Sequence, residues 1–455
     1  MSNQTTPNES SPRERASLDR ASVIGEKEGS ACRLAASAAT ASRRSARVAN
    51  HPVTDASRAL GNLRGVVILV VVAFHSALAY LGSSAPSAYP FDQPPYEWSA
   101  FPIIDHDRWF GFDLFCAWQD VYLMSLMFFL SGLLTWPSLD RKGDAKFLND
   151  RLWRLGLPFA FGVCVVMPLA LYPVYRVTAL DPSPAAYVRH YLALPFWPNG
   201  PMWFLWQLLA LTIAAVGIHR FSPHWLVALS RISSHADHRP ARYFAYFVIA
   251  CALAYVPLAV AFTPWGWSEH GLLSLQLSRP LLYAVYYFAG LAIGAKGFER
   301  RLFARDGTLA RHWRSWLLLA LASLALWMAL TDLTMNVGPP APMALQVAAD
   351  FAFVFADASS FFFIMAATVR FGAFGSRLLD RLSRNAYGLY LLHYAPVVWL
   401  QYSLLGVTAP AIAKALIVFL GAMLASWAAM AALRQARLGA LFLGEEARAL
   451  DRVAA

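Results

Sequence analysis

The feature that most constrains this chain is a series of long apolar stretches separated by short loops. A helix that rises about 1.5 Å per residue needs roughly 20 apolar residues to cross about 30 Å of hydrocarbon, and the stretches are of that order. Hydrophobic residues make up 58% of the 455 residues and charged residues only 14%, below the roughly 25% charged residues of soluble domains. The sequence therefore predicts an all-α, polytopic membrane protein.

We expect about ten transmembrane helices, because a helix satisfies every backbone N–H and C=O group in lipid without water. The stretches do not follow the alternating pattern of roughly 10 residues that marks an outer-membrane β-barrel. The predicted spans are 65–83, 112–136, 155–175, 202–220, 243–263, 280–297, 315–333, 346–370, 385–404 and 410–432. The span over 346–370 has the weakest signal, because it carries Asp350 and Asp357.

The net charge of +11 is concentrated in alternate loops. Arginine and lysine gather in the loops 137–154, 221–242, 298–314 and 371–384 and in the C-terminal tail, whereas the intervening loops hold few, among them Arg279. By the positive-inside rule the arginine-rich loops and both termini face the cytoplasm. The basic balance thus reflects membrane topology, and we expect no nucleic-acid partner.

The chain divides into three parts by composition. Residues 1–57 are rich in Ser, Ala and Arg and lack the apolar core of about 7–15 residues that a cleavable signal peptide needs. We expect them to form a disordered cytoplasmic tail, because they cannot bury enough apolar surface to offset chain entropy; a transit peptide is the alternative. Residues 58–432 form the predicted membrane domain, and 433–455 a cytoplasmic C-terminal tail.

Cysteine spacing indicates neither a metal site nor a disulfide framework. The four cysteines lie far apart, and none stands at the spacing to other Cys or His residues that metal ligands show. The sequence also contains no glycine-rich phosphate loop and no GxSxG motif. The candidates for function are the ionisable residues inside the predicted spans or at their ends, since such residues are usually functional in membrane proteins.

The stretch "LRGVVILVVVAFHSALAYLG" carries two such residues, Arg64 and His75. Eleven steps of 100° bring both side chains to one helix face, about 16 Å apart along the axis. With Arg64 at the cytoplasmic boundary, His75 would lie near the middle of the bilayer. Histidine is a natural general base, with an ordinary pKa near 6.5. The alternative is a structural hydrogen bond between helices.

The stretch "NDRLWRLGLPF" places Arg151 and Arg154 on one side of a helix, because they are three residues apart. Paired guanidinium groups at a membrane surface suit phosphate, which they bind in a bidentate manner. Arginines also flank spans for reasons of topology alone. A purely topological role is therefore the alternative to phosphate binding.

In "LSRNAYGLYLLHYAPVVWL", Tyr387, Tyr390 and His393 recur every three residues on an otherwise apolar helix. We interpret them as candidate acceptor-binding or channel-lining residues. An interfacial aromatic belt explains Tyr387 equally well. It explains His393 poorly, since that residue lies about 13 Å beyond Arg384.

Taken in order, these motifs resemble those of the acyltransferase 3 family of integral-membrane acyltransferases. "LRGVVILVVVAFHS" is similar to the family's R-x10-H motif, and "RLWR" to its RxxR motif after the second span. "FFLSGLL", "GPMWFLWQLL" and "SRNAYGLYLLHY" resemble other family landmarks. The resemblance covers roughly residues 58–432 and is strongest to the glucan-modifying, OpgC-like branch.

The resemblance implies that His75 is the catalytic base and that Arg64, Arg151 and Arg154 handle acyl-CoA on the cytoplasmic side. Family members move acetyl or other short acyl groups to extracytoplasmic glycans, lipids or secreted metabolites. The implied protein is an O-acyltransferase of the bacterial inner (plasma) membrane, with acetyl-CoA or succinyl-CoA as co-substrate, no bound cofactor and membrane lipids around it. Ser125 and Met202 depart from the family pattern, at places where many members carry Asp and His respectively.

A histidine base usually has an orienting partner, and depth in the membrane favours Asp357. Its distance from Arg370 puts it about 20 Å from the cytoplasmic side, against about 16 Å for His75. The alternative is a carboxyl group satisfied by Ser359, Ser360 or water.

Two other classes of function remain open. A proton-coupled transporter would use His75, Asp357 and His393 as a proton relay, although no inverted repeats are visible. A non-catalytic glycan- or lipid-binding membrane protein would keep the fold without chemistry. In every case the loops 84–111 and 176–201, rich in Pro and aromatic residues, are expected either to contact the acceptor or to anchor the protein at the interface.

Overall fold

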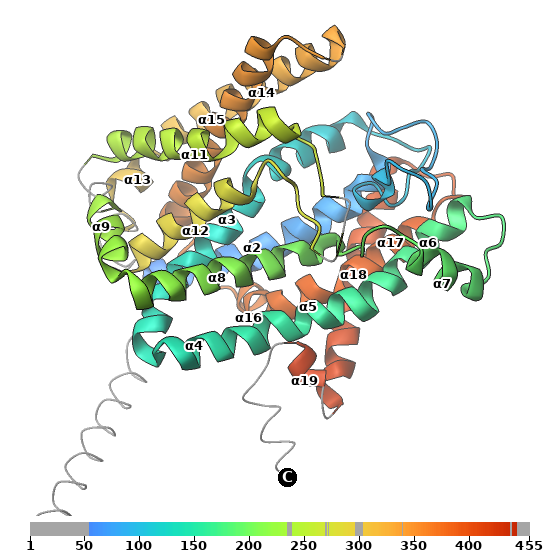
Figure 1. The fold of residues 1–455 in the computed structure, drawn as a ribbon, viewed down its shortest axis with the longest axis horizontal. Helices are drawn as coiled ribbons and strands as arrows, with labels where there is room; N and C mark the ends of the chain where they lie inside the picture. Colours follow the sequence, from blue (N-terminus) through green and yellow to red (C-terminus); the bar gives the residue numbers. More distant parts are fainter. Residues whose placement is uncertain are drawn as a thin grey trace, which may run out of the picture. The chain divides into compact units, whose positions relative to one another are not determined.

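The computed structural model describes residues 54–233, 239–268, 271, 273–295, 304–338, 340–436 and 439–443. The chain divides into Met1–Thr54 and Asp55–Ala455. Most of the predicted N-terminal tail and the end of the predicted C-terminal tail lie outside the described residues. Within the described part of Asp55–Ala455 the regular elements are helices, joined by loops with three isolated β-bridges (Figure 1).

Eight helical stretches are long and apolar enough to cross a membrane, which confirms the predicted all-α polytopic fold. They are Asp55–Tyr80 (α2, Asp55–Ala77, and η1, Leu78–Tyr80), α3 (Phe110–Lys142), Asp144–Thr178, Gly200–Phe221 (η5, Gly200–Met202, and α8, Trp203–Phe221), α11 (Pro240–Phe262), α14 (Trp313–Val337), α15 (Met343–Phe371) and α18 (Ala411–Gln435). The shorter elements are η2 (Glu97–Ser99), α7 (Pro184–Leu192), α9 (Pro223–Ser233), α13 (Thr308–Arg311) and α19 (Gly439–Phe442).

Two of the ten predicted spans take another form. The span predicted over 280–297 is the short helix α12 (Pro280–Gly294). The span predicted over 385–404 is two helices, α16 (Arg377–Leu392) and α17 (Tyr394–Ser403), with His393 at the junction. Pro396 explains the break, because proline has no N–H to donate to the carbonyl of Leu392 and its ring clashes there.

Helix α2 begins at Asp55, well before the predicted start at residue 65. Asp55 suits the first turn of a helix, where a negative charge is favourable. The side chain of Asn62 fixes this early part, because its amide donates to the carbonyls of Gly372 and Phe374, at 2.8 Å each. Arg64 therefore lies inside the helix and not at its start.

The stretch Asp144–Thr178 contains two wide, π-type turns. It runs through α4 (Asp144–Arg151), η3 (Leu152–Gly156), α5 (Leu157–Phe161), η4 (Gly162–Val166) and α6 (Met167–Thr178). Pro158 cannot donate to the carbonyl of Arg154, so that carbonyl is released from the helix ladder. Wide turns of this kind often occur at functional sites.

Helix α12 packs against α3 at very short range (Figure 1). A Cβ atom at Gly132 would lie 1.9 Å from the carbonyl oxygen of Tyr287, and one at Gly290 would lie 2.1 Å from that of Phe129. Small residues at helix interfaces allow such close contact in membranes, where dispersion forces replace the hydrophobic effect. The "FFLSGLL" landmark thus contains a packing position.

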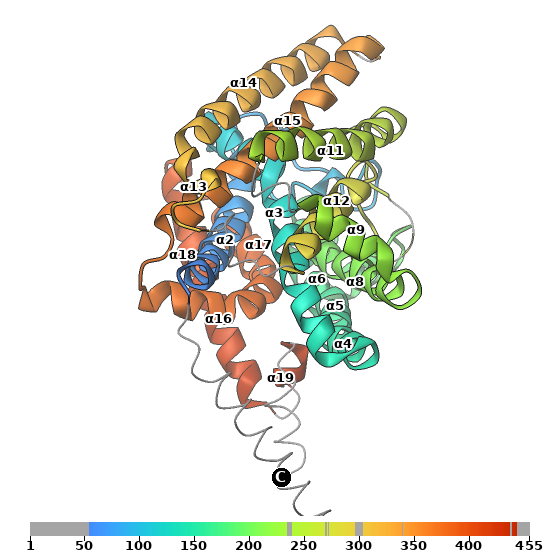
Figure 2. The same cartoon turned by 90° about the vertical axis from the view of Figure 1, so that its left-hand side faces the viewer.

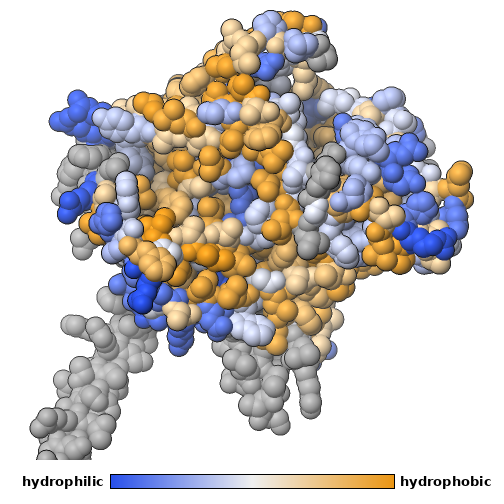
Figure 3. Space-filling model, viewed as in Figure 1, coloured by the Kyte–Doolittle hydropathy of each residue, from blue (hydrophilic) through white to orange (hydrophobic). Residues whose placement is uncertain are grey.

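Helix α2 lies against α3, α15, α16, α17 and α18, so its interior face is surrounded by other helices (Figure 2). Apolar side chains cover much of the surface over the helices, and hydrophilic ones gather towards the margins of the face in Figure 3. Leu253 and Leu424 are each 73% exposed, as expected of side chains that face lipid.

Candidate active site

The structure brings His75 of α2 into contact with His393 at the junction of α16 and α17. Nε2 of His393 lies 3.2 Å from Nδ1 of His75, and the two ring centroids are 4.9 Å apart at an interplanar angle of 61°. Nδ1 of His75 also lies 2.8 Å from the carbonyl oxygen of Val71. His393 is fully buried, whereas part of His75 stays exposed. The base and one of the channel residues predicted from sequence therefore form a pair.

Side chains of α2 and α17 fix the surroundings of this pair. The rings of Phe74 and Tyr394 meet the His75 ring edge-on, with centroid distances of 5.2 and 5.5 Å. Gln401 is buried, and its Nε2 donates to the backbone carbonyl of His75 at 2.8 Å. Since α2 ends at Ala77, this carbonyl belongs to the last turn, where helix carbonyls lack intrahelical partners.

The two tyrosines that precede His393 on α16 bind backbone carbonyls of other elements. Oη of Tyr387 donates to the carbonyl of Arg154 at 2.6 Å, the carbonyl that Pro158 releases. Oη of Tyr390 donates to the carbonyl of Pro201 in η5. The row predicted from the three-residue spacing therefore connects α16 to η3, to η5 and, through His393, to α2.

Arg151 and Arg154 lie beside Tyr387. Arg151 is half-buried at the end of α4, with its guanidinium 5.0 Å from the centre of the Phe147 ring. The charge of Arg154 and the hydroxyl groups of Tyr287 and Tyr387 lie close enough to act on Arg151 electrostatically. Arg154 itself is exposed. The structure thus groups the two arginines at one end of the row that leads to His393.

Arg64 is exposed on α2, about three turns before His75. Next to Arg64, helix α2 packs closely against α16 at Gly65. A Cβ atom at this glycine would lie 2.9 Å from the carbonyl oxygen of Leu379.

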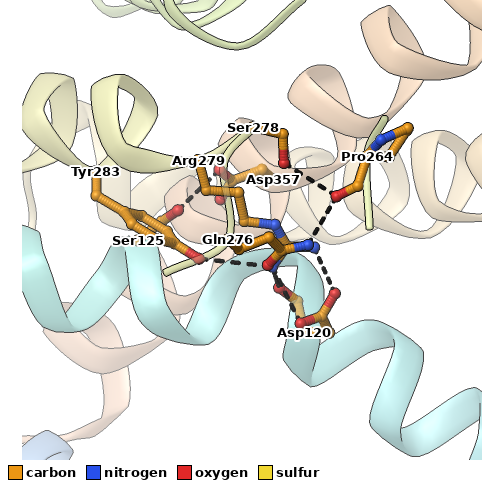
Figure 4. A network of polar contacts seen from close by, with 8 residues as sticks. All are labelled: Asp120, Ser125, Pro264, Gln276, Ser278, Arg279, Tyr283 and Asp357. Carbon is orange, nitrogen blue, oxygen red and sulfur yellow. Dashed lines mark hydrogen bonds and ion pairs between the residues drawn. The ribbon is translucent and has the colours of Figure 1, made fainter. Parts of the chain in front are cut away.

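Asp357 is bound by a different partner from the one predicted. Its Oδ2 accepts a hydrogen bond from Oγ of Ser125 at 2.9 Å, and the carboxyl group is fully buried in α15 (Figure 4). The ring of His75, by contrast, takes Val71 and His393 as its hydrogen-bond partners. The structure therefore does not pair Asp357 with His75, because counting residues along α15 cannot give the direction in which the side chain projects.

An ion pair between the buried Arg279 and the partly exposed Asp120 belongs to the network of polar contacts near Asp357 (Figure 4). Nη2 of Arg279 lies 2.6 Å from Oδ2 of Asp120, and Nη1 lies 3.0 Å from Oδ1. Nη1 also approaches the hydroxyl of Tyr283 at 3.5 Å, and the guanidinium lies 4.9 Å from the centre of the Phe353 ring. The sequence offered no signal for this pair, because its partners are 159 positions apart.

A second ion cluster joins α18 to the loop between η1 and α3. Nζ of Lys414 lies 2.9 Å from both carboxylate oxygens of Asp105 and 2.7 Å from Oδ2 of Asp107. The hydrogen bond and charge of Lys414 hold the pKa of Asp107 below its usual value. Lys414 is only 1% exposed, although the sequence places it in an apolar span.

Within the described ranges, no group of three or more His, Cys, Asp and Glu side chains is arranged to hold a metal ion. The side chains that the site does bring together suit proton transfer by a histidine pair and anion binding by arginines.

Comparison with known proteins identifies a family. The sequence model of a family described as an acyltransferase domain matches residues 58–431. No curated protein and no solved structure matches the chain. The matched segment contains both histidines, the three arginines and the helices that position them.

Proposed function

This chain belongs to the acyltransferase 3 family, and from this premise we propose that it transfers a short acyl group, acetyl or succinyl, from acyl-CoA to a hydroxyl group of an acceptor. The observation that carries the proposal is the contact between His75 and His393 inside a bundle of membrane-spanning helices. A histidine that is only partly buried at such a place is suited to accept a proton from a bound hydroxyl group.

In the proposed reaction, His75 removes the proton of the acceptor hydroxyl group, and the oxygen attacks the carbonyl carbon of the thioester. The C–S bond then breaks, and the departing CoA thiolate takes the proton back from His75. The products are the acyl ester and free CoA, so the enzyme returns to its initial state without net proton uptake.

Direct transfer is favoured over an acyl-enzyme formed on Ser76. The hydroxyl group of Ser76 is fully buried and donates to the carbonyl of Val72 at 2.7 Å. It therefore has neither access to a substrate nor a free orientation towards His75.

We propose that Arg151 and Arg154, with Arg64 assisting, bind the phosphates of CoA. Guanidinium groups bind phosphate with charge-assisted, often bidentate hydrogen bonds. Tyr387 contacts Arg154 and stands six residues before His393 on α16, which is about 9 Å along the helix axis. An extended pantetheine arm that follows this row would bring the thioester to the histidine pair.

We further propose an extracytoplasmic glycan, lipid or small molecule as the acceptor, with a glucan as the candidate that the OpgC-like resemblance favours. The arginine-rich loops and both termini would then face the cytoplasm of a bacterial inner membrane. Aromatic residues of the two candidate acceptor loops pack together: Phe91 stacks on Trp98 at 4.7 Å, and Trp98 on Phe196 at 6.1 Å. Trp98 is 1% exposed, so it stabilises these loops and leaves acceptor contact to more exposed neighbours.

The proposal is tested by incubating the purified protein in lipid nanodiscs with labelled acetyl-CoA or succinyl-CoA and a panel of glucans, lipids and polyols. We expect release of free CoA and transfer of label to one class of acceptor. A proton-coupled transporter or a binding protein without chemistry would consume no thioester, so an unchanged acyl-CoA pool with every acceptor would contradict the proposal.

A further inference from the structure

The two histidines are held by backbone carbonyl groups that determine where their protons lie. A carbonyl oxygen only accepts hydrogen bonds, so Nδ1 of His75, at 2.8 Å from the oxygen of Val71, carries a proton. In the same way, Nδ1 of His393 carries a proton because it lies 2.7 Å from the carbonyl oxygen of Tyr390. A neutral imidazole has one N–H group. Nε2 of His393 and Nε2 of His75 are therefore both unprotonated.

This assignment makes the contact between the rings a hydrogen bond with a fixed direction. Nδ1–H of His75 is shared between the oxygen of Val71 and Nε2 of His393, which accepts at 3.2 Å. A proton on Nε2 of His393 would instead require Nδ1 of His75 to lose its own, and its lone pair would then face the Val71 oxygen. The hydrogen bonds thus run in one direction: His75 donates to His393, and His393 donates to the carbonyl of Tyr390.

We propose that His393 is a positioning residue that, together with the Val71 carbonyl, holds the His75 ring in the orientation and tautomer whose Nε2 is free to act as the base. The inference rests on the proposed function. His393 lends itself to this role because it is fully buried, is anchored at Nδ1 and presents only an acceptor to His75.

The pair also determines what happens when His75 takes the proton of the acceptor. The imidazolium then donates from Nδ1 more strongly, and Nε2 of His393 stabilises it without a negative charge. A carboxylate in this place would hold the proton more tightly by ionic attraction. A neutral hydrogen-bond acceptor such as His393 orients the base and still lets it return the proton to the CoA thiolate. His75 is then ready for the next turnover.

The matched variants His393→Gln and His393→Met separate positioning from packing. The two side chains have almost the same length, but only glutamine offers a carbonyl oxygen to Nδ1–H of His75. We expect His393→Met to lower kcat about 100-fold while the KM for acyl-CoA stays within about threefold, and His393→Gln to keep at least about a third of the wild-type kcat. Equal losses in both variants, or wild-type kcat in His393→Met, would overturn the inference.

A second measurement needs no variant at position 393. Nitrogen-15 NMR of histidine-labelled wild-type protein reports the tautomer of each ring, and a His75→Gln sample identifies the signals of His75. We expect the Nδ1–H tautomer; the Nε2–H tautomer would overturn the inference. If the wild-type protein transfers no acyl group, the proposed function is wrong. If it transfers an acyl group but His75 is in the Nε2–H tautomer, only the proposed role of His393 is wrong.

Discussion

The pair His75–His393 and the pair Asp120–Arg279 both join helices that are far apart in the sequence, inside one apolar bundle. The two pairs differ in whether a side-chain group remains free to react once the contacts between the helices are made. Arg279 directs two nitrogens at the carboxylate of Asp120 and rests on Phe353, so its charge is compensated where it lies. In the arrangement that we propose, the histidine pair is neutral and leaves one basic nitrogen, Nε2 of His75, that takes no part in joining the helices.

This difference indicates which polar groups in a membrane protein hold helices together and which react. A buried charge must be paired, because desolvation penalises it strongly, and pairing removes it from chemistry. A neutral imidazole tolerates burial and can still accept a proton. We therefore expect variants of the ion pair to lose folded protein and variants of the histidine pair to lose turnover.

The largest expected effect comes from separating Asp120 and Arg279. Asp120→Leu leaves the buried guanidinium of Arg279 without a carboxylate to balance its charge, which typically costs about 3–5 kcal/mol, a large part of a total stability of about 5–15 kcal/mol. Arg279→Met should cost less, because the side chain of Asp120 is 35% exposed and can stay hydrated. Thermal unfolding in detergent checks both, and the double variant should recover much of the loss. Unchanged unfolding temperatures in both single variants would remove the contrast between the two pairs.

The next effect concerns charges that we propose to act on a ligand. Arg151→Ala and Arg154→Ala should each weaken acyl-CoA binding about tenfold or more, because hydrogen bonds to charged groups contribute about 1.5–3 kcal/mol. Arg311→Ala removes the same charge from an exposed position in α13 and serves as the control. Calorimetric titration with CoA gives the affinities. Wild-type affinity in both variants would return these arginines to a purely topological role.

A smaller effect is expected at Gln401, which contacts the histidine pair through the backbone. Gln401→Met removes the hydrogen bond to the carbonyl of His75 while keeping the side-chain length. Interhelical hydrogen bonds in membrane proteins contribute about 0.6 kcal/mol on average and at most about 1.7 kcal/mol. We expect a small fall in unfolding temperature and a turnover reduced by less than about tenfold. A loss as large as that of a catalytic residue would show that Gln401 acts on the substrate.

The smallest effect is a pH dependence at the Lys414 cluster. The ammonium group of Lys414 lowers the pKa of Asp107 from its usual 3.8, so this contact stabilises the folded state above that pH and is lost as the pH falls through the lowered value. Asp107→Asn should therefore reduce the unfolding temperature slightly at pH 7 and not at all in strong acid. A difference that persists unchanged at the lowest pH would assign it to packing instead.

Helical spacing predicted the parts of the site that depend on a single helix. Counting residues brought Arg64 and His75 to one face of α2 and placed Tyr387, Tyr390 and His393 in one row that runs along α16 to its junction with α17. The aromatic-belt alternative explained His393 poorly, and the structure places this residue against His75.

The parts that depend on packing between helices could not be predicted from the sequence. Counting from Arg370 gave the depth of Asp357, but the side of α15 that faces α2 is set by how the helices pack, and Asp357 points to Ser125. The partners of Arg279 and Lys414 are equally remote in sequence. One signal was available and was missed: Pro396 breaks the ninth predicted span just after His393.

The central claim is that His75 is the base of an acyl-transfer site and that His393 only orients it. It is tested most directly by the turnover of purified His75→Gln protein, since glutamine keeps hydrogen-bonding capacity but takes up no proton near neutral pH. We expect kcat to fall at least about 100-fold, as for a lost general base, while CoA affinity and unfolding temperature stay at wild-type values. A variant that retains more than about a tenth of wild-type turnover would contradict the account.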